Sequence, residues 1–385
     1  MADLSRIRNL YYQQFESKAT FLYSPGRINL LGDHTDYNAG LVMPAAIDFG
    51  ITFGIGKNNT DEVNILAADR NERITFNINK IEKNHKKEWA NFLLGVIDQF
   101  KRNGEKIGGF DLVFGGDLPA CAGLSSSTAL ECGLSFGLDR IFELGLSKRD
   151  HLSITHKADK EFMGLNRTYM DQFANLFSVA NHIIYLDCKN LYHEHLELEM
   201  SSFRFVLFDT QIKLDLNSSE YNARRQACDD AVETVQKYIP QVKTLRDLTP
   251  EALDKIKNKM YPPLYEKTSF IVDEIKRVEE AARDVRRKDW DAFGRKMYAS
   301  HDGLRDKYKV SCPELDFLVE KSKNYDNIKG ARLMGTGFGG CVIALVKMSN
   351  VEEMINDVKK AYKKKFGKKL IAYKARISNS TSLIA

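Results

Sequence analysis

Hydrophobic and polar positions alternate with different periods along the first half of the chain, and these periods predict its secondary structure. Short apolar runs surround a Pro-Gly turn in 21–31 and continue through 41–56, which indicates strands. In 125–145, three leucines recur every four residues, which is typical of a helix. A further helix is predicted over 88–104, where a glycine ends the apolar periodicity.

The second half of the chain is patterned differently, since it is mostly helical and charged from 220 to about 325. Two strands are predicted before this helical part, at 182–188 and 204–210. After it we predict a strand, a glycine loop and a strand in 331–346, then a helix over 351–367 and a strand at 370–378. A chain of 385 residues is too long for one ordinary core. We therefore predict two domains, 1–200 and 201–385.

Composition and charge exclude several classes of protein. Hydrophobic residues make up 43% and charged residues 28% of the chain, and the net charge is only +5, so we expect no nucleic-acid partner. No apolar run is long enough to cross a bilayer, and the N-terminus lacks the apolar core of a signal peptide. The six cysteines form no CxxC pair, which favours reduced thiols in a cytoplasmic protein with no membrane partner.

The stretch GRINLLGDHTDYNAG, residues 26–40, combines an apolar strand with a dense group of charged and polar side chains. Arg27, Asp33, His34 and Asp36 lie within ten residues of one another. Burying an unpaired charge costs several kcal/mol, so these groups need partners. The stretch therefore predicts either a network of ion pairs or a site for a polar ligand.

The strongest local signal is LPACAGLSSSTALE, residues 118–131. Its small residues let the backbone approach a ligand closely, and its three serines open a predicted helix. Unpaired N–H groups and positive partial charge at a helix N-terminus suit a phosphate, and a serine hydroxyl can ligate Mg²⁺. The alternative is that Ser125 is only the N-cap, although one serine suffices for that.

A second glycine loop, GTGFGG at 335–340, formally matches the dinucleotide pattern GxGxxG. That pattern requires a helix after the glycines, whereas a strand, CVIALVKM, follows here. We therefore reject a Rossmann fold, and the chain also has no GxxxxGK[ST] motif. The loop is expected to approach another loop or a phosphate closely, unless it is a plain tight turn.

Several segments resemble the motifs of one family, in the family's order. SPGRINLLGDHTDYNAGLVMPAAI resembles the galactokinase signature, and LPACAGLSSSTALE and GARLMGTGFGGCVIALV resemble the second and third motifs of the GHMP small-molecule kinases. YMDQF, NSSEYNARR and SHDGLRDKYKVSCPELD resemble further galactokinase segments. The resemblance implies an ATP-dependent sugar 1-kinase of α+β (α/β two-domain) class. Its GHMP kinase fold would join an N-terminal α/β domain to a C-terminal ferredoxin-like α+β domain, with the active site between them.

The resemblance also implies roles for particular residues. Asp171 would take the proton of the anomeric hydroxyl, and Arg27 would lie against Asp171 and the transferred phosphoryl group; an isolated Asp171 would more simply be a solvated helix residue. The sugar would be bound by Asp33, His34, Thr35, Asp36, Thr168 and Tyr221. Sugar hydroxyls donate and accept hydrogen bonds, so carboxylates and an imidazole suit them.

For the nucleotide, the resemblance implies a phosphate loop and a magnesium site. The loop residues are Cys121, Ala122, Gly123, Leu124, Ser125, Ser126 and Ser127, with Gly335 and Gly337 in the second loop. Mg²⁺ would be held by Ser127 and Asp159. Trp89 and Phe92 would lie near adenine, although either ring would also suit an ordinary core.

The chain departs from the family pattern at several of these positions. Asp33 and Asp159 each stand where the family usually has glutamate, which shortens the side chain by about 1.5 Å. Thr168 stands where the family has a glycine, and threonine does not readily adopt a positive φ. Arg167 adds a charge beside the site. Cys121 and Phe92 stand for the family's glycine and tyrosine.

These departures leave three interpretations open. The chain is a galactokinase, a 1-kinase for another sugar such as N-acetylgalactosamine or another aldose, or a regulator that binds sugar and ATP without turnover. Arg27, Asp171 and the serine loop are retained, which favours catalysis, and galactose is the preferred substrate. Nothing in the pattern indicates an oligomer, so we expect a monomer whose partners are a small-molecule sugar and ATP.

Overall fold

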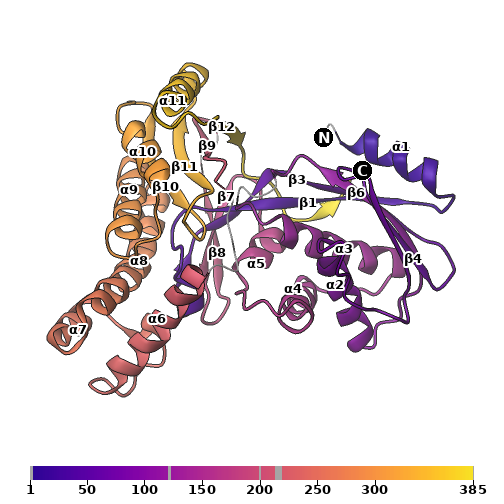
Figure 1. Cartoon of the computed structure of the whole chain (residues 1–385), viewed down its shortest axis with the longest axis horizontal. Coiled ribbons are helices and arrows are strands. Elements are labelled where there is room, and N and C mark those ends of the chain that lie inside the picture. Colours follow the sequence, from indigo (N-terminus) through magenta and orange to yellow (C-terminus); the bar gives the residue numbers. More distant parts are fainter. Residues whose placement is uncertain (1–2, 120–122, 199–200, 213–218, 385) are drawn as a thin grey trace.

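The protein is described by a computed structural model that covers residues 3–119, 123–198, 201–212 and 219–384. It has two lobes that lie side by side (Figure 1). A six-stranded sheet organises the first lobe, and a four-stranded sheet with long helices organises the second. Both helices and strands occur in each lobe, which confirms the predicted mixed class.

The sheet of the first lobe is mostly antiparallel, whereas β4 and β6 pair in parallel. Its strands lie in the order β13 (Ser382–Leu383), β1 (Thr20–Asn29), β3 (Pro44–Lys57), β6 (Phe110–Gly116), β4 (Glu62–Ala67) and β5 (Glu72–Asn77). Strands are thus confirmed in 21–31 and 41–56, and they are neighbours in the sheet. The predicted Pro-Gly turn is wrong, because β1 continues through Pro25 and Gly26 with only a register shift there. Because β13 pairs with β1, the end of the chain returns to the first lobe.

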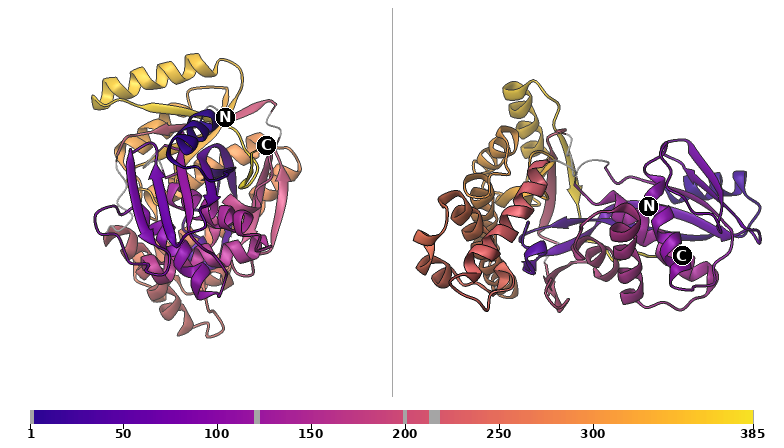
Figure 2. Two further views of the ribbon diagram at one scale, coloured as in Figure 1. Left: turned by 90° about the vertical axis from the view of Figure 1, so that its right-hand side faces the viewer. Right: turned by 60° about the horizontal axis from the view of Figure 1, so that its bottom comes forward.

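Helices cover both faces of this sheet, with α1 on one face and the others on the opposite face (Figures 1 and 2). They are α1 (Leu4–Gln14), α2 (Ala90–Arg102), α3 (Ser126–Phe142), α4 (Lys148–Lys157), the π-helical turn η2 (Ala158–Met163) and α5 (Met170–Phe177). The helices predicted over 88–104 and 125–145 are confirmed as α2 and α3. Buried leucines of α3 pack with those of α2 in one apolar core.

The second lobe contains an antiparallel sheet in the order β10 (Ile328–Met334), β11 (Cys341–Lys347), β9 (Phe203–Asp209) and β12 (Ile371–Ala375). Its helical elements are α6 (Ser219–Gln236), η3 (Leu245–Asp247), α7 (Pro250–Lys255), η4 (Lys257–Lys259), α8 (Pro262–Arg286), α9 (Trp290–Asp306), α10 (Pro313–Ser322) and α11 (Val351–Phe366). The predicted helical, charged stretch and the strand–glycine loop–strand that follows it are both confirmed.

A small third sheet and the loop before it lie between the lobes. The sheet joins β2 (Leu41–Val42), β7 (His182–Asp187) and β8 (His193–Glu197), and the loop contains the turn η1 (Asp36–Asn38). Apolar residues at the end of β1 pack in the same core as those of α8 and β10. The polar stretch predicted at 26–40 is therefore buried where the two lobes meet. Among the described residues, no helix is both long and apolar enough to span a membrane.

Candidate active site

Two charged side chains 144 residues apart form the centre of the site. Arg27 follows a register shift in β1, an irregularity of the kind that re-aims side chains, and Asp171 lies in the first turn of α5. Arg27 Nε donates to Asp171 Oδ1 at 2.7 Å, and Nη2 donates to Oδ2 at 3.0 Å. The third nitrogen, Nη1, donates to the carbonyl of Gly123 at 2.5 Å. The pair is therefore bidentate and tied to the phosphate loop.

The surroundings of Asp171 keep its carboxyl group ionised. Burial alone would raise the pKa of Asp171, but the Arg27 guanidinium outweighs it and holds the pKa below its usual value. The Ser125 hydroxyl, which donates to Asp171 Oδ2 at 2.6 Å, acts in the same direction. A partly buried carboxylate that is anionic near neutral pH can accept a proton from a substrate hydroxyl.

The predicted phosphate loop leads into the N-terminus of α3, which begins at Ser126. Ser125 is the residue before this helix, but its side chain caps no backbone N–H and bonds Asp171 instead. Its φ of 59° is left-handed, which is uncommon for a residue other than glycine. The interpretation of Ser125 as only an N-cap is therefore wrong, and its hydroxyl belongs to the charged centre.

The loop is fixed against β1 by a close backbone contact. The carbonyl of Leu124 accepts a hydrogen bond from the backbone N–H of Arg27 at 3.1 Å. A Cβ at Gly26 would lie 2.9 Å from the same carbonyl oxygen, so glycine is required for this approach. Cys121 and Ala122, the other predicted loop residues, lie outside the described residues.

The predicted magnesium ligands lie beside this centre. Asp159 is fully buried in η2, and its Oδ2 accepts a hydrogen bond from Gln172 at 2.8 Å. Arg167 Nη1 contacts both ligands, lying 3.0 Å from Ser127 Oγ and 3.3 Å from Asp159 Oδ1. Burial raises the pKa of Asp159, and the positive charge of Arg167 opposes that effect.

The donor atoms at this end of the site fit Mg²⁺. The buried Glu131 lies one helical turn after Ser127, and its carboxyl group faces that of Asp159 without other hydrogen-bond partners in the part of the chain that the structure describes. Burial, together with the nearby Asp159, raises the pKa of Glu131 well above its usual value. No three acidic, histidine or cysteine side chains form a complete metal cage in the described ranges. Mg²⁺ needs none, because it is usually held by one or two carboxylates and substrate phosphates.

On the other side of Asp171, two predicted sugar-binding residues lie in contact. The Thr168 hydroxyl donates to Asp36 Oδ2 at 2.5 Å. Burial raises the pKa of Asp36, and the nearby Asp171 carboxylate adds to the effect. Asp36 is therefore within the electrostatic reach of Asp171, and its contact with a sugar stays a prediction.

Aromatic rings surround the second predicted sugar-binding position, His34. Its ring centroid lies 4.9 Å from that of Tyr308 and 6.1 Å from that of Tyr221 on α6, and its Nδ1 bonds the Tyr37 hydroxyl at 2.9 Å. The Nε2 atom is buried and makes no well-formed hydrogen bond within the described residues, although the backbone of Thr336 lies near the ring. Burial lowers the pKa of His34 to about 4, so the ring is neutral at physiological pH. A φ of 67° adds local strain of the kind found at functional sites.

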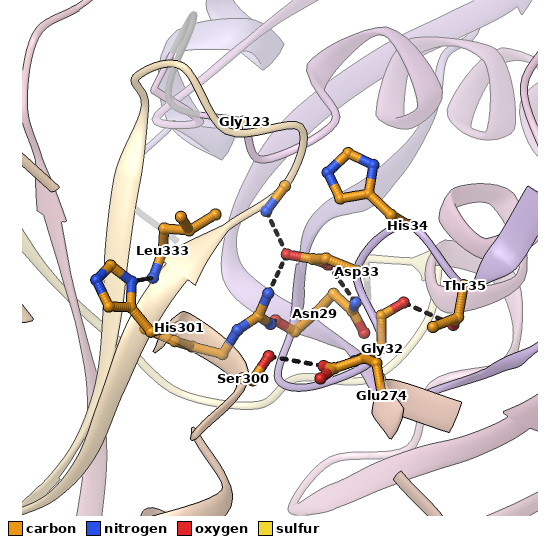
Figure 3. A network of polar contacts seen from close by, with 12 residues as sticks. Asn29, Gly32, Asp33, His34, Thr35, Gly123, Glu274, Ser300, His301 and Leu333 are labelled. Atoms are coloured by element: carbon orange, nitrogen blue, oxygen red, sulfur yellow. Dashed lines mark hydrogen bonds and ion pairs between the residues drawn. The ribbon is translucent and has the colours of Figure 1, made fainter. Parts of the chain in front are cut away.

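Asp33 is held by protein groups (Figure 3). Its Oδ1 accepts a hydrogen bond from Asn29 at 2.5 Å, and its Oδ2 pairs with Arg332 on β10 and accepts from the backbone N–H of Gly335 at 2.7 Å. Asp33 is 3% exposed and Arg332 is fully buried. The carboxylate therefore joins the two lobes, and a direct contact between Asp33 and a sugar stays a prediction.

Thr35 also stabilises the loop that carries the predicted sugar-binding residues. It is fully buried, and its hydroxyl bonds the carbonyls of Gly32 at 2.8 Å and Leu41 at 2.6 Å. The N–H of Gly32 in turn donates to the buried Glu274 of α8 at 3.0 Å, and Ser300 donates to the same oxygen at 2.6 Å (Figure 3). The loop is thus fixed from both lobes.

The second glycine loop approaches another loop, as one of its interpretations predicted. A Cβ at Gly337 would lie 2.2 Å from the carbonyl oxygen of Val310, which also accepts a hydrogen bond from Phe338 at 2.7 Å. Position 337 also has a φ of 81°, so both the close contact and the left-handed backbone favour glycine there. A direct contact of Gly335 or Gly337 with a phosphate stays a prediction.

The two predicted adenine-binding aromatics differ in their surroundings. Trp89 packs on Phe114 of β6, with ring centroids 5.5 Å apart, and its Nε1 donates to Glu72 at 2.5 Å. Phe92 lies under the Arg167 guanidinium, 5.7 Å from the ring centroid. Phe92 thus faces the phosphate end of the site, whereas Trp89 is half-buried at the margin of the core of the first lobe.

Some residues of the site were not predicted from the sequence. Glu131 follows Ser127 by four residues on a helix, so helical spacing could have placed both on one face. Glu274 and Arg332 have no comparable signal, because their partners lie 242 and 299 residues away.

Three family models match the chain. The galactokinase galactose-binding signature matches residues 9–57, the GHMP kinase N-terminal domain matches 91–178, and the GHMP kinase C-terminal domain matches 281–364. The first match contains Arg27 and the polar stretch, and the second contains the phosphate loop and Asp171.

Known proteins resemble the whole chain. A galactokinase of Roseiflexus sp. (strain RS-1) is 33% identical over 100% of this chain and 98% of its own, and one of Clostridium perfringens is 35% identical over 98% of both. The crystal structure of Lactococcus lactis galactokinase complexed with galactose matches with a TM-score of 0.94 and 31% identity, over 99% of this chain and 100% of that one. Methanococcus jannaschii mevalonate kinase shares the fold, with a TM-score of 0.69 and 18% identity over 95% of this chain and 100% of that one.

Proposed function

We propose that this chain, which belongs to the galactokinase family of the GHMP kinases, transfers the terminal phosphoryl group of ATP to the C1 hydroxyl of galactose. The products would be galactose 1-phosphate and ADP. The observation that carries the proposal is the bidentate pair of Arg27 and Asp171 beside the N-terminus of α3. This arrangement combines a base, a cation and a phosphate-binding helix end in one place.

The pair supports in-line phosphoryl transfer, which depends mainly on positioning and electrostatics. Asp171 would accept the proton of the C1 hydroxyl, and the O–H bond would break as the new P–O bond forms. Arg27, held on Asp171 and on the carbonyl of Gly123, would stabilise the charge that develops on the phosphoryl oxygens. The N–H groups that begin α3 would bind the nucleotide phosphates.

We also propose that the enzyme uses Mg²⁺ with ATP. Ser127 and Asp159 would hold the ion, and the buried Glu131 supplies further oxygen acceptors next to them. The bound ion would neutralise charge on the phosphates.

For the sugar, we propose that Asp36, His34 and Tyr221 provide the hydrogen-bonding groups. The unpartnered Nε2 of His34 supports this assignment, because a neutral imidazole nitrogen can bond a hydroxyl. A site built around such a bond strongly rejects a sugar that lacks the hydroxyl.

One contact favours a second substrate, an N-acetylhexosamine or another aldose. Thr168 stands where the family has a glycine, and its hydroxyl bonds Asp36. This side chain takes up both space and an acceptor at the sugar end. Turnover of another sugar in preference to galactose would support this alternative.

The deciding experiment measures Mg²⁺-dependent ADP release from ATP with galactose, N-acetylgalactosamine, galactosamine, glucose, mannose, arabinose and fucose. Phosphorus NMR identifies the phosphorylated carbon. We expect galactose to be preferred, with phosphate on C1. Binding of ATP without turnover of any sugar would contradict the proposal and favour a regulator.

We further propose that the enzyme is a cytoplasmic monomer. Its cysteines are free thiols wherever the structure describes them, which suits a reducing compartment. Light scattering of the purified chain tests the monomer, since a dimer would have twice the mass expected from the sequence.

A further inference from the structure

Arg167 is the charged residue of the site that the proposed mechanism leaves without a role. It lies in the loop between η2 and α5, directly before Thr168. A hydrogen bond anchors this loop to the second lobe, because Arg225 of α6 donates to the carbonyl of Asn166 at 2.7 Å. The Arg167 side chain turns to the phosphate end, where its guanidinium lies over Phe92.

The two arginines of the site differ in how far their N–H donors are engaged. All three nitrogens of Arg27 are bonded, two of them to Asp171 and one to Gly123. Arg167 uses only Nη1, which bonds Ser127 and Asp159, and its other N–H groups have no acceptor in the described ranges. Its side chain keeps 24% of its surface exposed, so a ligand can reach part of it.

Several acidic side chains surround Arg167 at this end of the site. Burial alone would lower the pKa of Arg167, but three carboxylates outweigh it and raise the pKa, so the group is always cationic. The carboxylates belong to Asp159, Glu131 and Asp171. Those of them that are ionised, above all Asp171, would repel a nucleotide triphosphate in the absence of a nearby cation.

The two acceptors of Arg167 are also the two proposed metal ligands. If Ser127 and Asp159 bound Mg²⁺, the Arg167 guanidinium would lose the two acceptors that it bonds without the metal. Phosphate oxygens are then the acceptors that can satisfy it, since a guanidinium matches phosphate with two parallel hydrogen bonds.

We propose that Arg167 is a phosphate-binding residue, whose guanidinium donates hydrogen bonds to the terminal phosphates of the bound nucleotide. The residue holds Ser127 and Asp159 together before the nucleotide binds, and it supplies a fixed positive charge where the phosphates enter. Nucleotide affinity therefore depends less on Mg²⁺ than it would with a neutral side chain at this position. This inference rests on the proposed kinase function.

The test is calorimetric binding of AMP and of the non-hydrolysable β,γ-imido analogue of ATP, each with excess Mg²⁺ and with excess EDTA. We expect R167Q to bind the triphosphate about 10- to 100-fold more weakly, the effect of losing a charged hydrogen bond, with the larger loss in EDTA. AMP lacks the terminal phosphates, so its affinity should be unchanged. R167K keeps the charge but not the planar fork, and should be intermediate.

Two variants separate this role from a structural one. R167Q leaves the buried Asp159 without its cation, and R167Q/D159N removes that unpaired charge. In EDTA, where no metal contributes, the double variant should lose as much affinity for the triphosphate as R167Q does. R140Q removes one positive charge from the last turn of α3, far from the loop, and should bind both nucleotides as wild type does.

The outcomes are distinct. Equal binding of the triphosphate by wild type and R167Q in EDTA would overturn the inference, as would equal losses for AMP and the triphosphate. If the wild-type protein binds neither nucleotide, the proposed kinase function fails instead.

Discussion

At the residue scale, the two oxygens of Asp171 have different partners, and this difference determines what the carboxylate can do. Oδ1 is bonded by Arg27 alone, whereas Oδ2 is bonded by Arg27 and by Ser125. Oδ1 therefore keeps more capacity to accept a proton from the sugar. The guanidinium stays in place throughout, because its third nitrogen is fixed on Gly123.

Asp171→Asn keeps the shape of this side chain and removes the base. We expect kcat to fall by about 10²- to 10⁴-fold, the usual contribution of a general base. ATP affinity should change little, because the phosphate loop is unaltered. Steady-state ADP release and calorimetry measure the two effects, and a kcat near that of wild type would exclude Asp171 as the base.

The buried, neutral His34 should make the free energy of unfolding fall as the pH is lowered. Its pKa is about 4 in the folded protein, below the ordinary 6.5, so the unfolded chain binds the proton more readily. Stability conferred by the neutral ring is complete above pH 6.5 and is lost as the pH falls towards 4. The loss at pH 4 is about 3 kcal/mol relative to pH 7.

We therefore expect the free energy of unfolding of H34Q to decline less than that of wild type between pH 7 and pH 4. Urea titrations at each pH measure this difference. H85Q, which changes an exposed histidine, should decline as wild type does. Parallel declines of wild type and H34Q would show that His34 is not buried in its neutral form.

At the scale of elements, the N-terminus of α3 combines two functions in one residue. Ser125 ends the phosphate loop in a left-handed conformation and also donates to Asp171. Because the Ser125 side chain caps no backbone N–H, its removal loses no cap, and glycine suits this φ better than serine does. Stability and activity should therefore separate at this position.

Ser125→Gly should keep the melting temperature and lower kcat/KM by about 10-fold or more, because a hydrogen bond to a charged group is lost. The Ser125 bond lowers the pKa of Asp171, so its removal should also move the acid limb of the kcat/KM profile to higher pH. Ser125→Ala should lower activity equally and stability more. An unchanged pH profile in S125G would show that Ser125 does not act through Asp171.

The elements themselves could largely be predicted from hydrophobic periodicity. Local pattern predicts the strands in 21–31 and 41–56, the helix α3 and the strand–loop–strand around GTGFGG. The π-helical turn at Asp159 and the left-handed His34 and Ser125 could not be predicted. Local sequence pattern gives no signal for these conformations, which are uncommon in residues other than glycine or in helices generally.

At the scale of the whole molecule, the site depends on pairs that no local pattern reveals. The pairing of Arg27 with Asp171 was expected only through the family resemblance, and the pairing of Asp33 with Arg332 was not expected at all. A charged cluster in 26–40 indicates that partners exist, but the chain's fold determines which they are. The motif around Asp33 therefore predicts a sugar-binding residue, whereas in the structure Asp33 bonds Arg332 and Gly335 of the second lobe.

The ion pair of Asp33 and Arg332 gives the last prediction, because a buried pair costs most when only one partner is removed. D33N and R332M should each lower the free energy of unfolding by about 3–5 kcal/mol, since each leaves one uncompensated buried charge. D33N/R332M removes both charges and should be clearly more stable than the sum of the single effects predicts. Urea unfolding of the four proteins measures the coupling, and additive losses would show that the pair does not join the lobes.

Galactose affinity then tests the remaining role of Asp33. If the double variant regains stability but not affinity, Asp33 also contacts the sugar; if it regains both, Asp33 acts only by holding the loop against β10.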